Sequence, residues 1–147
     1  MTDSPVWTRW VGSALVWLIL SLATPALACP PVKPLRFTPG TDSARIEGGV
    51  PRGMRDCLSL QLGQGQRLTV AVLPGPDDNI VFQIYRPGWR VSGPPDSVAI
   101  DGEPLPGTAE GTDARTFDGR LPVSGAYLLV IGTTRGGGAY RISVSAR

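Results

Sequence analysis

Apolar and polar residues alternate in short runs along most of the chain. The clearest runs cover 58–62, 67–72, 80–85 and 140–145. A period of two places one set of side chains in a core and the other in solvent, which is typical of a β-strand with one buried face. No stretch after residue 28 carries a helical pattern for more than one turn. We therefore predict β-strands over all four runs.

The run Tyr127–Ile131 is different because it is apolar at every position. A strand that is apolar on both faces is expected in the middle of a sheet covered on both sides, so we place this one at the centre of the domain. Weaker strand patterns occur at Ala44–Glu47, Ser97–Ile100 and Arg115–Phe117. Seven or eight short strands predict an all-β fold, an antiparallel jelly-roll-like β-sandwich.

Two connections between the strands carry a further signal. The link Leu62–Gln66 is short and contains glycine, which predicts a β-hairpin between the strands on either side. The segment 86–113 is long and rich in Pro, Gly and acidic residues, and within it only Ser97–Ile100 is predicted to be ordered. Loops of this length are often functional or mobile.

The N-terminus predicts export. Residues 1–28 resemble a secretory signal peptide, with Arg9 before an apolar stretch over 10–23 and an A-x-A cleavage pattern ending at Ala28. The apolar stretch is shorter than the roughly 20 residues that span a membrane. We expect a signal peptide over 1–28, a Pro-rich arm over 29–42 and the sandwich domain over 43–147, in a bacterial periplasmic or secreted protein without a membrane span.

Two cysteines follow the cleavage point, Cys29 and Cys57. Disulfides persist outside the cytoplasm, so a Cys29–Cys57 bridge that ties the arm to the domain is the first interpretation. Alternatively, Cys29 is the first residue after cleavage and carries a lipid anchor, which leaves Cys57 unpaired. The two interpretations exclude each other.

Composition excludes several kinds of chemistry. The 147 residues contain no His, which excludes Ser-His-Asp and Cys-His catalysis and the HExxH type of zinc site. The net charge of +2 gives no reason to expect a nucleic-acid partner. We expect no enzymatic activity, no cofactor and no metal. The turn Asp77–Asn79 offers oxygen ligands without EF-hand spacing, which leaves calcium binding an open question.

The segment Tyr85–Arg90 is the first candidate contact site. It places Trp89 between Arg86 and Arg90 beside a turn. Trp, Tyr and Arg dominate binding hot spots, and a Trp face also suits sugar stacking. Exposure of Trp89 would favour binding of an envelope glycan or protein by Tyr85, Arg86, Trp89 and Arg90. If Trp89 folds back on the core, the arginines are ordinary surface charges.

The C-terminal half resembles a known family. The run Phe117–Tyr127 and the final strand at 139–144 are similar to the bacterial pre-peptidase C-terminal domain, whose pattern is aromatic-x-G-x-L-P-x-S-G-x-Y followed by a closing Tyr-containing strand. Upstream, Gly65–Val70 and Phe82–Gly88 resemble further elements of that family. The resemblance implies a jelly-roll-like β-sandwich of secreted proteins, without catalytic residues of its own.

A weaker resemblance is to periplasmic lysozyme inhibitors. Several unrelated inhibitor families place a Ser-Gly-x(x)-Tyr loop in the active-site cleft of the enzyme, and the segment from Ser124 to Tyr127 fits that pattern. An inhibitor would need Ser124 at an exposed loop tip. Arg135, beside three glycines, is a further candidate because its guanidinium and the neighbouring backbone amides could meet an anion.

Three functional hypotheses result. The main one is a non-catalytic periplasmic or secreted module that binds an envelope glycan or protein. The second is a periplasmic lysozyme inhibitor, which predicts that substitution of Ser124 or Arg135 abolishes inhibition while the fold stays intact. The third is a structural accessory protein anchored by lipid at Cys29.

Overall fold

The alternating runs form strands in the computed structural model, which describes residues 31–147. The predicted signal peptide and Cys29 lie outside these residues. The strands in chain order are β1 (Lys33–Pro34), β2 (Ser43–Val50), β3 (Asp56–Leu62), β4 (Arg67–Val72), β5 (Ile80–Tyr85), β6 (Arg90–Ser92), β7 (Ala99–Asp101), β8 (Thr116–Arg120), β9 (Gly125–Thr133) and β10 (Gly138–Ala146). Within residues 31–147 no helix could cross a membrane.

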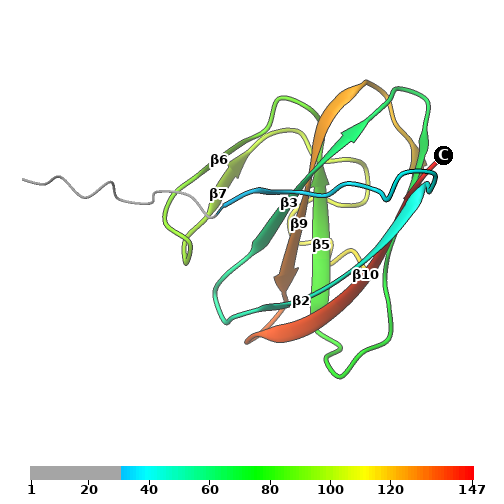
Figure 1. The fold of residues 1–147 in the computed structure, drawn as a ribbon. Coiled ribbons are helices and arrows are strands. Elements are labelled where there is room, and N and C mark those ends of the chain that lie inside the picture. Colours follow the sequence, from blue (N-terminus) through cyan, green and yellow to red (C-terminus); the bar gives the residue numbers. More distant parts are fainter. Residues whose placement is uncertain (1–30) are drawn as a thin grey trace, which may run out of the picture.

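The strands form two four-stranded sheets that pack face to face (Figure 1). The first sheet has the order β1-β3-β9-β5 and the second the order β2-β10-β4-β8. All neighbours are antiparallel except β1 and β3. A separate hairpin of β6 and β7 completes the fold. The predicted all-β sandwich is confirmed.

The core lies between the two sheets and is built from the alternating apolar positions. From β9 come Tyr127, Leu129 and Ile131, and from β10 come Ile142 and Val144, all of which are almost completely buried. Full burial of such a side chain contributes roughly 1.5–3 kcal/mol. On β10 the polar residues between these positions, Arg141 and Ser143, lie on the outer face, as the period of two predicts.

A second, smaller cluster covers the outer face of the first sheet. Cys57, Leu128 and Val130 point away from the core, yet they are buried because Trp89 and other residues of the β6–β7 region pack against them. β9 is therefore covered on both faces. This arrangement confirms the prediction drawn from its continuous apolar run.

The predicted hairpin at Leu62–Gln66 is wrong. β3 belongs to the first sheet and β4 to the second, so this link crosses from one sheet to the other. Leu62 and Leu68 both point into the core from opposite sides. The alternation is the same for a hairpin and for a crossover, so the sequence pattern could not separate them.

The segment 86–113 is more ordered than the sequence predicted. β6 pairs with β7, and the chain then returns along the edge of β5. There Leu105 N–H donates to Ile84 O at 2.8 Å, and the buried Thr108 hydroxyl donates to Leu105 O at 2.9 Å. The segment thus covers the β5 edge, which would otherwise expose unpaired backbone groups.

Gly48 on β2 makes room for an aromatic ring. It lies directly opposite Tyr140 on β10, and a Cβ at Gly48 would lie 2.6 Å from the Tyr140 ring carbon Cζ. The Tyr140 hydroxyl also donates to Asp56 Oδ2 at 2.6 Å, which fixes the ring. We expect Gly48→Ala to lower the free energy of unfolding by about 1–3 kcal/mol because the ring must move. Urea denaturation measures this, and an unchanged midpoint would contradict the packing described.

Candidate functional site

The loop before β9 presents Ser124 to solvent. Leu121 anchors the loop, since its N–H donates to Gln66 O and its carbonyl accepts from Gly65 N–H, each at 2.8 Å. Pro122, Val123 and Ser124 are then exposed. We call Pro122–Ser124 the tip.

Ser124 is braced from the neighbouring link between β3 and β4. Its Oγ accepts a hydrogen bond from Gln64 N–H at 2.8 Å. A serine hydroxyl has one O–H to donate as well as lone pairs to accept. Because this contact uses a lone pair, the Ser124 O–H stays available to an external acceptor.

Tyr127 is an internal anchor of the tip. Its side chain is 0 % exposed, and its hydroxyl donates to Val123 O at 2.7 Å. The Ser-Gly-x-Tyr segment therefore divides its roles, with Ser124 outside and Tyr127 inside. Among residues 31–147, Val123 is the one large apolar side chain that is exposed, at 36 %.

The candidate residues of Tyr85–Arg90 lie beside the same loop. Trp89 is half-buried, and its Nε1–H donates to Ala126 O at 2.8 Å. Arg86 pairs with Glu103 at 2.6 Å, while Arg90 is exposed. The structure thus places the Trp89 ring as a support behind the start of β9.

Tyr85 is buried, so it offers little surface to a ligand. Its hydroxyl donates to Gln83 Oε1 at 3.0 Å. Burial raises the pKa of the Tyr85 hydroxyl, and the charge of Glu110 adds to the effect. Tyr85 therefore stays protonated and acts as a hydrogen-bond donor within the protein.

Arg135 lies at the other end of β9 from Ser124. The strand between them has nine residues, so it is roughly 27 Å long at about 3.3 Å per residue. Arg135 and Asp78 form an exposed ion pair at 3.3 Å. The structure therefore does not bring Ser124 and Arg135 into one site.

The acidic turn before β5 is used for internal contacts. Asp77 Oδ2 accepts from Ala139 N–H at 2.7 Å, and Asn79 Nδ2 donates to Arg135 O at 2.6 Å. Across residues 31–147, no three His, Cys, Asp or Glu side chains gather in a group that could hold a metal ion.

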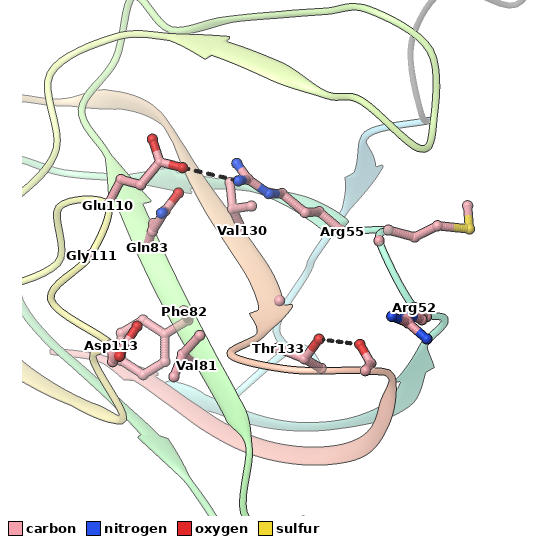
Figure 2. Close-up of a pocket in the computed structure, with 14 residues that line it drawn as sticks. Arg52, Arg55, Val81, Phe82, Gln83, Glu110, Gly111, Asp113, Val130 and Thr133 are labelled. Atoms are coloured by element: carbon pink, nitrogen blue, oxygen red, sulfur yellow. Dashed lines mark hydrogen bonds and ion pairs between the residues drawn. The ribbon is translucent and has the colours of Figure 1, made fainter.

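A groove of about 510 Å³ opens on the outer face of the first sheet, beyond the cover of the β6–β7 hairpin (Figure 2). Val81 and Gln83 from β5 and Val130 and Gly132 from β9 form its floor. Its walls come from the β2–β3 loop, the segment 110–113 and the β9–β10 turn. Sequence analysis missed this groove because its residues come from five separate stretches of chain that only the folded sheet brings together.

Cys57 is buried beneath the N-terminal arm. β1 pairs with β3 in parallel, and Val32 packs on the cluster that contains Cys57. Cys29 precedes Val32 by three residues but lies outside the described part, so the predicted disulfide stays a prediction. The mass of the exported protein tests it, because a disulfide removes two hydrogens whereas a lipid adds its acyl chains.

When Cys29 is absent, as in a Cys29→Ser variant, Cys57 is a buried thiol, which has a consequence for stability at alkaline pH. Burial, with the charge of Asp56, raises its pKa from 9.0 to about 11. Between these values the unfolded chain loses the thiol proton and the folded chain keeps it, so the free energy of unfolding falls as pH rises. We expect the Tm of Cys29→Ser to fall more between pH 8 and 10.5 than that of Cys29→Ser/Cys57→Ala. Equal falls would contradict this assignment.

Comparisons with known proteins identify the fold. No family model matches the sequence, and no curated protein matches it. The resemblance to the pre-peptidase C-terminal domain therefore gains no support. Solved structures are similar to this chain, and three of them are PliG proteins, periplasmic lysozyme inhibitors of g-type lysozyme.

The PliG of Aeromonas hydrophila has a TM-score of 0.56 and 24% identity, over 79% of this chain and 96% of that one. A mutant PliG from Escherichia coli has a TM-score of 0.55 and 16% identity, and the match covers 78% of this chain and 96% of that one. The Salmonella Typhimurium PliG has a TM-score of 0.52 and 18% identity, and the match again covers 78% of this chain and 96% of that one. The chain therefore shares the β-sandwich fold of these three inhibitors over almost their whole length.

Proposed function

We propose that this protein is a periplasmic lysozyme inhibitor, that g-type lysozyme is its first candidate target, and that the tip Pro122–Ser124 enters the enzyme's cleft. The similarity to three PliG structures, each covered over 96% of its length, supports this function over a general glycan- or protein-binding module. The exposed tip is the observation that carries the choice of contact surface, because a cleft accepts a protruding loop.

The chemistry of the tip suits a glycosidase cleft. Glycoside hydrolases position Asp or Glu carboxyl groups beside the bond that they cleave. Ser124 Oγ already accepts from Gln64 N–H, so its own O–H is free to donate to a partner. A hydrogen bond to a charged group contributes about 1.5–3 kcal/mol. A Ser124 hydroxyl donated to a cleft carboxylate would block the catalytic machinery directly.

Preorganisation supports tight binding. Three sets of hydrogen bonds hold the tip. The Tyr127 hydroxyl donates to Val123 O, and Gln64 N–H donates to Ser124 Oγ. The backbone of Leu121, just before the tip, is hydrogen-bonded to the link between β3 and β4. Ordering a flexible loop on binding costs free energy, and a loop that is already held avoids most of this cost. Val123 adds exposed apolar area next to the serine.

The same geometry assigns a supporting role to the Trp89 segment. Trp89 holds the Ala126 carbonyl, and a Cβ on Gly125 would lie only 2.9 Å from Pro87. This segment therefore backs the start of β9, and Arg90 remains exposed. We expect Trp89 to matter for the position of the tip more than for contact with a partner.

The test is a cell-wall lysis assay with the purified protein from residue 29 onward. Turbidity of a bacterial cell suspension is followed with g-type lysozyme, and with chicken-type and invertebrate-type lysozymes for specificity. We expect inhibition of the g-type enzyme and a one-to-one complex in gel filtration. Full lysis by all three enzymes at micromolar protein would overturn the proposal and return attention to the binding-module hypothesis.

A further inference from the structure

The groove on the outer face of the first sheet has walls of opposite charge. The β2–β3 loop supplies Arg52 and Arg55 on one side, and the segment 110–113 supplies Glu110 and Asp113 on the other (Figure 2). The floor between them is part of the sheet, from β5 and β9. A molecule in the groove would therefore meet the Arg52 guanidinium at one side, the Asp113 carboxylate at the other, and the Arg55–Glu110 ion pair that joins the two sides (Figure 2).

Two of these four charged side chains, Arg55 and Glu110, pair with each other. Arg55 Nη2 meets Glu110 Oε1 at 3.1 Å, and the Glu110 side chain is 74% exposed. Arg52 makes no hydrogen bond or ion pair with another residue among 31–147, and it is exposed. The Arg55 side chain is 32% exposed, so the pair is only partly buried and stays open to solvent on the Glu110 side. Ion pairs near the surface contribute about 1 kcal/mol or less, so a ligand can replace this one at small cost.

The floor supplies polar groups and room. Gln83 accepts from the Tyr85 hydroxyl through Oε1, which leaves its amide N–H groups free to donate. Gly132 lies in β9, and a Cβ there would meet only Arg55 Cγ, at 3.9 Å. A glycine inside a strand weakens it and often marks a place where a ligand or another backbone comes close.

We propose that this groove binds a short zwitterionic peptide, with its free carboxylate at Arg52 and Arg55 and its free ammonium group at Glu110 and Asp113. Its volume of about 510 Å³ lies within the range of small-molecule sites, roughly 300–1,000 Å³. Guanidinium groups bind carboxylates through paired, charge-assisted hydrogen bonds. The opposite wall would repel a second carboxylate and attract an amine. Two charged ends are therefore recognised together, which distinguishes this ligand class from a simple anion.

This site is separate from the proposed inhibitory tip. The groove lies toward the end of β9 that carries Thr133, whereas the tip precedes Gly125 at the strand's beginning. Peptide binding can therefore be measured whether or not the protein inhibits a lysozyme.

The test uses trialanine as the probe and NMR of the isotope-labelled protein from residue 29 onward. We expect shifts at the backbone amides of Gly53, Gly111 and Gly132 that saturate with trialanine. N-acetylated and C-amidated trialanine should each bind at least ten-fold more weakly. Absence of saturable shifts, or equal binding of the blocked peptides, would overturn the proposal.

Two substitutions localise the effect. Gly132→Leu fills the floor without a backbone penalty and should weaken trialanine binding at least ten-fold, whereas Ser143→Leu, on the outer face of β10 in the other sheet, should not. Arg52→Gln, on the exposed wall, should weaken the binding of trialanine. It should have little further effect on the binding of the C-amidated peptide, because the substitution and the amidation remove the same contact between carboxylate and guanidinium. Unchanged trialanine affinity in both Gly132→Leu and Arg52→Gln would overturn the proposal.

Discussion

Replacing Ser124 with Asp is expected to weaken lysozyme inhibition at least 100-fold while leaving the fold intact. The Asp carboxylate can still accept from Gln64 N–H, so the brace that holds the tip is kept. The O–H donor is lost, and a negative charge now faces the carboxylates of the enzyme cleft. Two like charges about 4 Å apart repel by about 4 kcal/mol at an effective dielectric constant of 20.

Arg135→Ala is the matched control. Arg135 is also an exposed loop residue, but it lies at the opposite end of β9, and its ion pair with Asp78 is almost fully solvated. We expect its inhibition constant to stay within two-fold of the wild type, as measured in the same turbidity assay. If Arg135→Ala abolished inhibition and Ser124→Asp retained it, the contact surface would lie at the Arg135 end of the sandwich, which would contradict the proposed tip.

Replacing Tyr127 with Ala is expected to lower the free energy of unfolding by about 3–5 kcal/mol, because a fully buried aromatic side chain leaves a cavity in the core. Domains of this kind are stable by only about 5–15 kcal/mol. Thermal and urea denaturation measure the loss. A Tm within two degrees of the wild type would contradict the position of Tyr127 at the centre of the core.

Tyr127→Phe separates packing from the anchoring of the tip. The ring stays, but the hydrogen bond to Val123 O is lost. We expect a loss of about 1 kcal/mol in stability. Inhibition should weaken by several-fold because the tip is less well ordered. Unchanged inhibition with unchanged stability would show that the Tyr127 hydroxyl does not hold the tip.

The alternation of residues was sufficient to predict which side chains form the core. Leu68 and Val70 are buried where the period of two placed them, and the continuous apolar run of β9 is buried on both faces. Sheet membership was not predictable in the same way. The link after Leu62 has the composition of a hairpin, and only the completed pairing of β3 with β9 and of β4 with β10 shows that it crosses between sheets.

The tip could be proposed from the sequence, but its organisation could not. The Ser-Gly-x-Tyr spacing singled out Ser124 and Tyr127, whereas the brace from Gln64 joins residues 60 positions apart. The groove is a stronger example, since Arg55 and Glu110 are 55 positions apart and meet only because β3 and β5 flank β9. Contacts of this kind depend on tertiary pairing, which local patterns do not contain.

Occupation of the enzyme cleft by the tip is tested most directly by competition. The dissociation constant of the complex with g-type lysozyme is measured by titration calorimetry, with and without a chitooligosaccharide that fills the cleft. The expected result is a one-to-one complex whose apparent Kd rises linearly with the concentration of free oligosaccharide, because the two ligands compete for the same cleft. No complex, or a complex whose Kd the oligosaccharide leaves unchanged, would contradict the account.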